Sequence, residues 1–322
     1  MSRSPLSYRS VFLAVAAAAA CAGCSAGSGS MSPLTPGGEN ALRGAGSWMA
    51  PNAGRGDLLY VSDFQNDTVS VFSFPKGQLQ GTLTGFAGPF GECTDRAGDI
   101  FIANDKPPEI LEFAHGGTAP IATIKDPGQY PYACSVDPKS GNLAVTNEYA
   151  RNSTPGSVAI YQHASGTPKL YHDASFNYMF FCGYDNAGNL FVDGEPPGTG
   201  SFAFAELPRG GSKLKDIALD TTIGFPGGVQ WDGQHLAVGD QIASTIYQFD
   251  ISGKTGVETG STHLNQTKQI VQFWKQGAYV VGPDAIYFRV GIWNYPGGGD
   301  PITFLPVNWG LPVAATVSRA PK

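Results

Sequence analysis

The chain has 322 residues, of which 43 are glycine and 24 are proline, while charged residues make up only 14% and hydrophobic residues 42%. This composition excludes a coiled coil or a helix bundle, and the 11% of aromatic residues excludes a disordered chain. The formal charge of −6 comes without any basic run, so nucleic acid is a poor partner. Many short strands joined by tight turns are expected.

The N-terminus has the pattern of an export signal. Arg3 and Arg9 form a basic start, and residues 11–20 are an apolar run that is too short to span a bilayer as a helix. The segment Cys21-Ala-Gly-Cys24 follows directly and resembles a bacterial lipobox, in which the last cysteine becomes lipidated and forms the new N-terminus. The resemblance implies a lipoprotein signal peptide over residues 1–23 and lipidation at Cys24. Ordinary signal-peptidase cleavage near the same place is the alternative.

Residues 24–55 are rich in Ser, Gly, Pro and Ala and show no hydrophobic period, so they are predicted to form a flexible tether. Ser25 directly after the cysteine favours the outer membrane, by resemblance to lipoproteins of double-membraned bacteria. No other segment approaches 18 apolar residues, so no membrane-spanning helix is expected. The protein is therefore predicted to be exported and held at the cell envelope by its lipid anchor only.

The rest of the chain repeats a unit of about 44 residues. Each unit has an opening strand, a turn of the Asp-x-x-Gly-Asn kind and a second strand of alternating apolar residues, as in residues 131–147. A third strand, a Gly-rich turn and a fourth strand follow. Six turn glycines mark the units: Gly56, Gly98, Gly141, Gly188, Gly233 and Gly277. Six units of this length fit the four-stranded blades of a propeller.

The two ends of the repeat array complement each other. The first unit lacks its opening strand because only the tether precedes Gly56, whereas residues 311–318 match the opening-strand pattern and are left over. Chain ends that share one blade would close the ring and hide the strand edges. The predicted fold is all-β: a six-bladed β-propeller over residues 56–318 with four-stranded blades, closed by a C-terminal strand that completes the first blade.

The repeat pattern Pro-x-Gly-x-x-x-Asp-x-x-Gly-Asn-Leu-x-Val-x-Asn resembles the NHL repeat. The whole array resembles six-bladed propellers of the NHL and SMP-30/gluconolactonase type. This architecture hosts binding proteins, lactonases and lyases alike, so the resemblance implies a fold and leaves the activity open.

Three cysteines lie outside the signal region, Cys93, Cys134 and Cys182, all in opening strands. Cys93 and Cys134 belong to neighbouring blades and could point towards each other, and disulfides persist in exported proteins, so a Cys93–Cys134 bridge is predicted. The alternative is that all three are small buried apolar residues. A metal site is less expected because no histidine lies at ligand spacing near them.

The second strand of each unit ends in a polar or acidic residue, and these residues share one face of the predicted disc near the channel. They are Asp63, Asn104, Asn147, Asp193, Asp240 and Asp284. Several oxygens around one axis could bind a ligand or a hard cation such as Ca²⁺. In SMP-30-like enzymes a divalent metal held by Glu, Asp and Asn activates lactone hydrolysis, but that ligand motif does not match here residue by residue. The plainer interpretation is that Asp and Asn cap the loops that follow.

No catalytic motif occurs: the sequence has no H-E-x-x-H, no P-loop and no dinucleotide fingerprint. Aromatic residues near the C-terminus, among them Trp293 and Trp309, could line a carbohydrate or peptide site or pack between blades. The first hypothesis is a lipid-anchored, monomeric propeller without a cofactor that binds a protein or a small molecule on one face. The alternative is a metal-dependent hydrolase of the lactonase type.

Overall fold

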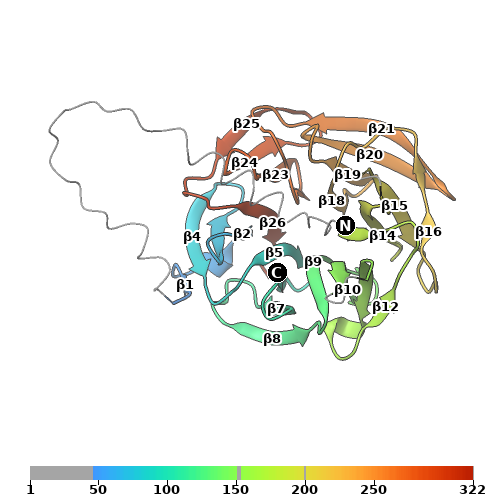
Figure 1. The fold of residues 1–322 in the computed structure, drawn as a ribbon. Coiled ribbons are helices and arrows are strands. Elements are labelled where there is room, and N and C mark those ends of the chain that lie inside the picture. Colours follow the sequence, from blue (N-terminus) through green and yellow to red (C-terminus); the bar gives the residue numbers. More distant parts are fainter. Residues whose placement is uncertain (1–45, 151–153, 199–200, 322) are drawn as a thin grey trace, which may run out of the picture. The chain divides into compact units, whose positions relative to one another are not determined.

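The computed structural model describes residues 46–150, 154–198 and 201–321. The predicted signal peptide, the lipidation site at Cys24 and most of the predicted tether lie outside the described residues. In the described body, six β-sheets stand around a common axis like the blades of a propeller (Figure 1). The predicted six-bladed all-β fold is confirmed. Among the described residues no helix has the length and apolarity needed to cross a membrane.

Each blade contains an antiparallel sheet whose first strand lies nearest the axis (Figure 1). From the axis outwards, blade 1 has β26 (Pro312–Ser318), β2 (Leu58–Asp63), β3 (Thr68–Ser73) and β4 (Gln78–Leu83), and blade 2 has β5 (Pro89–Thr94), β6 (Ile100–Asn104), β7 (Glu109–Phe113) and β8 (Pro120–Lys125). Blade 3 has β9 (Gln129–Val136), β10 (Leu143–Ala150), β11 (Ser157–Tyr161) and β12 (Lys169–Tyr171), and blade 4 has β13 (Tyr178–Tyr184), β14 (Leu190–Glu195), β15 (Ala203–Leu207) and β16 (Lys215–Asp216). Blade 5 has β18 (Pro226–Trp231), β19 (Leu236–Asp240), β20 (Thr245–Ser252) and β21 (Thr255–His263), and blade 6 has β22 (Trp274–Gln276), β23 (Tyr279–Asp284), β24 (Arg289–Asn294) and β25 (Gly298–Phe304).

The C-terminal strand closes the ring, as the leftover opening strand predicted. β26 pairs antiparallel with β2, in a register that runs from Leu58 opposite Ser318 to Asp63 opposite Pro312. In Figure 1 it is the dark red strand that completes the blue blade. Apolar residues of both strands enter one buried cluster with blade 6, in which Leu59 is fully buried. The first and last segments of the propeller therefore form one sheet.

The body begins earlier than Gly56. The two-residue strand β1 (Trp48–Met49) pairs with the outer edge of β4, and Ala53 in the 3₁₀ helix η1 (Ala53–Arg55) is buried against blade 1. The predicted tether boundary at residue 55 is therefore too late. The physical reason lies at Gly81 of β4, where a Cβ atom would sit 2.6 Å from the carbonyl oxygen of Trp48, so the missing side chain admits the added strand.

Blades 4 and 5 depart from the four-strand pattern. The fourth strand of blade 4, β16, has only two residues, because the chain leaves the blade after Asp216. The following strand β17 (Ala218–Leu219) pairs in parallel with β21 and becomes a fifth strand of blade 5. The fourth strand of blade 4 is consequently shorter than β12 and β21, the fourth strands of the neighbouring blades.

Two further features concern the packing between blades. A disulfide joins Cys93 of β5 to Cys134 of β9, whose Cα atoms lie 5.5 Å apart, while Cys182 is a buried free cysteine. Trp293 and Trp309 are buried in apolar clusters, so they pack rather than line a site.

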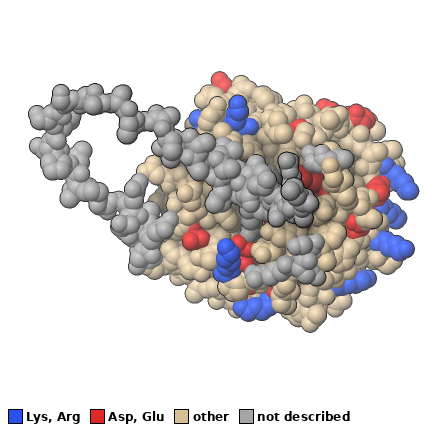
Figure 2. All heavy atoms as spheres, in the orientation of Figure 1, with Lys and Arg blue, Asp and Glu red and all other residues tan. Residues whose placement is uncertain are grey.

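Figure 2 shows acidic and basic side chains interspersed along the right-hand edge of the disc, which keeps this part of the circumference hydrated.

Removing the disulfide is expected to destabilise the propeller. The double variant Cys93→Ala/Cys134→Ala should lose about 3–4 kcal/mol of unfolding free energy in urea titrations, since the bridge closes a loop of 41 residues in the unfolded chain. A reductant should destabilise the wild-type protein and the control variant Cys182→Ala, but not the double variant. A wild-type protein whose stability is unchanged by reductant would contradict this expectation.

Candidate functional site

All six residues of the predicted rim are buried, and each lies at or near the end of the second strand of its blade. They are Asp63, Asn104, Asn147, Asp193, Asp240 and Asp284. The face of the disc at which the second strands end is here called the rim face. The shared position follows from the repeat, because equivalent strands in every blade run in the same direction relative to the axis.

Four rim residues hold the backbone of their own blade. In each, a side-chain oxygen accepts an N–H group from the loop that enters the innermost strand. The donors are Gly310 and Leu311 for Asp63, Ala87 for Asn104, Gly224 and Phe225 for Asp240, and Lys268 for Asp284, at distances of 2.6 to 3.3 Å. The three aspartates also accept N–H groups from the turn that follows the second strand. Their oxygens thus stabilise loops, as the capping interpretation expects.

The other two rim residues, in blades 3 and 4, are bound differently. Asp193 Oδ1 accepts the N–H of Phe181 at 2.9 Å, and Asn147 Nδ2 donates to Ser157 Oγ at 3.2 Å. The second oxygen of Asp193 and the amide oxygen of Asn147 are buried without a hydrogen-bond partner among the described residues. Burial raises the pKa of Asp193 well above its ordinary value. Within the described residues, no group of three or more His, Cys, Asp and Glu side chains is arranged to hold a metal ion.

Aromatic side chains line the inner part of the rim face in an arc that crosses five blades. The aromatic arc consists of Phe64, Phe90, Tyr132, Phe180 and Phe225, whose successive ring centroids are 5.8, 4.1, 5.0 and 6.0 Å apart. Phe90 and Phe180 lie at register shifts in the innermost strands, and such bulges redirect side chains. The three middle rings are buried, so the arc makes a packed floor.

A second group of rings continues from this floor towards the surface. Tyr178 stacks on Phe180 at 6.1 Å, Tyr149 meets Tyr178 edge to face at 6.1 Å, and Tyr130 lies 4.5 Å from Tyr149. Tyr130, Tyr149 and Tyr178, here called the tyrosine cluster, are half-buried and belong to β9, β10 and β13. Burial raises the pKa of Tyr178, and the carboxylates of Glu148 and Glu195 add to the rise. The cluster therefore combines partly exposed rings with nearby negative charge.

A buried acid lies deeper, between blades 1 and 2. Glu92 of β5 is fully buried, and its carboxyl group accepts a hydrogen bond from Ser62 Oγ at 2.5 Å. Burial raises its pKa from 4.5 to about 8. The Gln272 amide of blade 6 bonds both the N–H and the carbonyl of Glu92, at 3.1 and 2.6 Å. Blades 6 and 2 are thus tied together next to the closing strand.

Comparison with known proteins identifies the architecture. No protein-family model matches the sequence, and no curated protein matches it. Among solved structures, a chain of the nidogen/laminin complex matches with a TM-score of 0.68 and 12% identity, over 83% of this chain and 100% of that one. A protein of unknown function from Bacteroides caccae matches with a TM-score of 0.61 and 13% identity, over 82% and 99%. The chain shares their fold. At these identities the likeness shows the fold alone.

Sequence reasoning singled out the rim but missed the aromatic arc and the tyrosine cluster. The sequence feature that could have indicated the aromatic arc is an aromatic residue near the start of several opening strands, as in Phe90, Tyr132 and Phe180. In a single unit such a residue is indistinguishable from ordinary packing. Only the ring of blades brings residues from units far apart in the sequence into one row.

Glu92 is expected to make the protein less stable at alkaline pH. Folded Glu92 keeps its proton up to a pKa of about 8, whereas the unfolded chain releases it near 4.5, so stability falls as pH rises through this window. The slope from this residue is at most about 1.4 kcal/mol per pH unit. In urea titrations, Glu92→Gln should gain stability relative to wild type at about pH 9 but little at about pH 5. If the unfolding free energy of the two proteins depended on pH in the same way, the raised pKa of Glu92 would be contradicted.

Proposed function

We propose that the protein is an exported binding module that holds a protein or small-molecule ligand on its rim face, at the tyrosine cluster. The observation behind the proposal is the position of three half-buried tyrosine rings beside a packed aromatic floor. Tyrosine supplies a large apolar contact area together with a polar hydroxyl, which makes it frequent in binding surfaces. Because the floor is packed, the rings are held in place before a ligand arrives, and less entropy is lost on binding.

Charge narrows the kind of ligand. Glu195 ends β14 directly opposite Tyr178, and partial burial raises the pKa of its carboxyl group. A half-buried carboxylate next to aromatic faces favours a neutral or positively charged group and disfavours an anion. The proposal therefore expects a ligand with an apolar surface and no net negative charge where it meets the cluster.

The exported location rests on the N-terminal pattern and gains support from the disulfide. A bond between Cys93 and Cys134 persists in oxidising compartments and is rare in the cytosol. Signal cleavage, acylation at Cys24 and anchoring at the outer membrane belong to the same proposal, as does membership of the NHL and SMP-30/gluconolactonase type of propeller.

The tyrosine cluster can be tested by substitution. The full chain, fluorescently labelled, is applied to arrays of immobilised oligosaccharides and peptides. The double variant Tyr130→Ala/Tyr149→Ala should weaken the strongest wild-type interaction roughly tenfold or more, because each ring removes apolar contact area. Tyr171→Ala, which removes a half-buried ring from the outermost strand of blade 3, is the matched control and should bind like wild type. Undiminished binding by the double variant would contradict the proposal.

The second function suggested by the sequence, a metal-dependent lactonase, receives less support. Such an enzyme needs three or four oxygens around one ion with a position left open. Four rim residues use their oxygens on backbone N–H groups, and unpartnered oxygens in the described rim occur only at Asn147 and Asp193. The rim residues thus do not fit a ready-made metal site.

Thermal unfolding with and without calcium separates the two functions. A metal at a hundred times its Kd would stabilise the fold by about 2.7 kcal/mol and raise Tm by roughly 5–10 °C. We expect millimolar CaCl₂ to change Tm by less than about 1 °C, equal to the effect of NaCl at the same ionic strength. A calcium-specific rise of several degrees, lost in Asp193→Asn, would instead favour the hydrolase.

A further inference from the structure

A pocket of about 480 Å³ lies between blades 4 and 5, and none of its lining residues belongs to the tyrosine cluster. It exists because the fourth strand of blade 4 is short. The N–H of Ile217 bonds the carbonyl of Phe204, and the chain then crosses to blade 5 as β17, so the start of β15 at Ala203 has no outer neighbour among the described strands. The segment 221–223 forms the opposite wall. The size falls within the range of small-molecule sites in proteins.

Both walls of the pocket are fixed by hydrogen bonds. Thr221 donates its hydroxyl to the carboxylate of Glu258, and the N–H groups of Gly224 and Phe225 bond Asp240. On the other side, Phe204 lies within the ladder between β14 and β15. The opening therefore exists before any ligand arrives, and a ligand does not have to order the walls.

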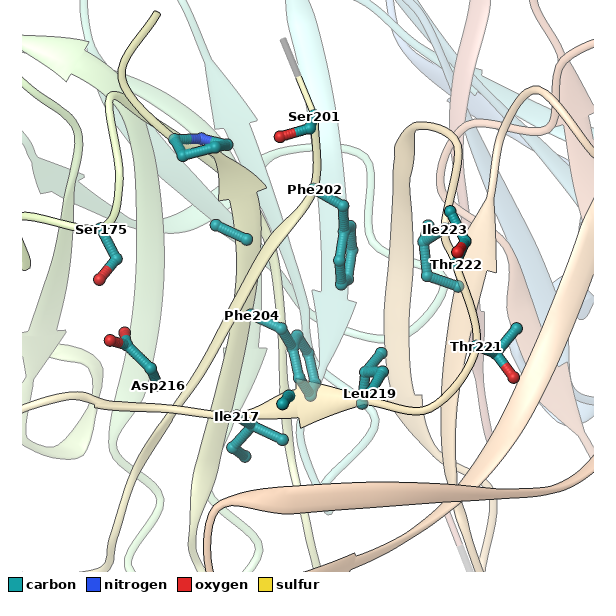
Figure 3. A pocket seen from close by; sticks show the side chains of 13 residues that line it. Ser175, Ser201, Phe202, Phe204, Asp216, Ile217, Leu219, Thr221, Thr222 and Ile223 are labelled. Carbon is teal, nitrogen blue, oxygen red and sulfur yellow. The ribbon is translucent and has the colours of Figure 1, made fainter. Parts of the chain in front are cut away.

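A stack of phenylalanine rings leads into the pocket. Phe191 and Phe204 are buried and stack with centroids 6.1 Å apart and an interplanar angle of 15°. Phe202 stacks on Phe204 at 5.8 Å and 20°, and it is only half-buried. Figure 3 shows Phe202 and Phe204 following one another along one wall, with Leu219 near their lower end and Ile223 across the opening. The last ring of the stack is the one that the pocket leaves partly uncovered.

The polar groups of the lining limit the charge of a ligand. The pocket has hydroxyl groups from Ser175, Ser201, Thr221 and Thr222, and its one charged side chain among the lining residues is the carboxylate of Asp216. No Lys or Arg is among the lining residues. Such a lining suits a neutral molecule that presents a flat apolar ring to the phenylalanine stack and a hydroxyl group to the polar side chains of the pocket. It disfavours an anion.

We propose that this pocket is a binding site for a small, neutral, planar aromatic compound, which continues the stack by lying against Phe202. An aromatic pair prefers offset stacking with centroids 4.5–7 Å apart, the spacing already present between the three phenylalanines. Ile223 supplies an apolar contact from across the opening, and Leu219 supplies one near the lower end of the stack. The site shares no residue with the tyrosine cluster, so it stands or falls separately from the function proposed above.

Titration with 2-naphthol, followed by saturation-transfer NMR and calorimetry on the full chain, tests the site. Wild-type protein should bind one equivalent with a Kd of about 1 mM or tighter. Phe202→Ala should weaken binding roughly three- to tenfold, Phe202→Tyr should restore it, and Ala218→Trp, which places a bulky group in the opening, should abolish it. Tyr171→Ala and Tyr130→Ala/Tyr149→Ala change no residue that lines the pocket, and they serve as controls that bind 2-naphthol like wild type.

Two related probes check the chemistry. 2-Naphthoate, the anionic counterpart, should bind at least tenfold more weakly than 2-naphthol. Decanol, which is neutral but has no ring, should fail to displace bound 2-naphthol. The proposal is overturned if wild type shows no saturable binding, or if Phe202→Ala and Ala218→Trp bind as wild type does. Equal affinity for 2-naphthoate, or displacement by decanol, would likewise contradict a site for a neutral planar ring.

Discussion

The pairing of β26 with β2 is the constraint on which the rest of the structure depends. It joins the last described strand to the first blade over the full length of both strands, from Leu58 opposite Ser318 to Asp63 opposite Pro312. Without it, β2 would present a buried apolar face and an unpaired edge to water. The same strand is bonded on the blade 6 side, where the backbone of Gln272 pairs with Val313 and Ala315. Closure is therefore shared by blades 6, 1 and 2.

A closed ring brings the innermost strands close together, and this explains the chemistry near the axis. At Gly91 a Cβ atom would lie 2.5 Å from the carbonyl oxygen of Tyr132 in the next blade, so only glycine permits the observed approach. The innermost strands also carry buried rings of the aromatic arc and the buried acid Glu92. The rim aspartates accept hydrogen bonds from loops, and Glu92 accepts one from the neighbouring blade. The two candidate binding sites therefore lie elsewhere, at the tyrosine cluster on the rim face and in the pocket between blades 4 and 5.

The sequence predicts the repeated features well because each follows from local physics. The turn glycines Gly98, Gly141, Gly188, Gly233 and Gly277 all adopt positive φ, as a tight turn between an opening strand and a second strand requires. Gly56 does not, since no opening strand precedes it. The leftover strand at residues 311–318 predicts closure for a simple reason: strands with one buried face need a partner.

The features that the sequence does not predict depend on contacts between units. β1 adds to blade 1 because Gly81 leaves room for it, and β17 joins blade 5 because blade 4 releases the chain after Asp216. Neither event has a local signal. The repeat pattern locates the rim residues at the second strands of their blades, but a single sequence does not reveal that Asp63 meets the backbone of Gly310, which is 247 positions away. The tyrosine cluster and the phenylalanine stack likewise form only once the blades are side by side.

Native-state hydrogen exchange of the β26 amides tests ring closure most directly. If the ring is closed as described, the amides of Ala314 and Thr316, which face β2 in the ladder, exchange as slowly as those of Leu59 and Val61 in β2, through global unfolding only. Exchange of β26 at the rate of exposed loops, while β2 and β3 remain protected, would mean that the strand is not part of blade 1 and would contradict the account.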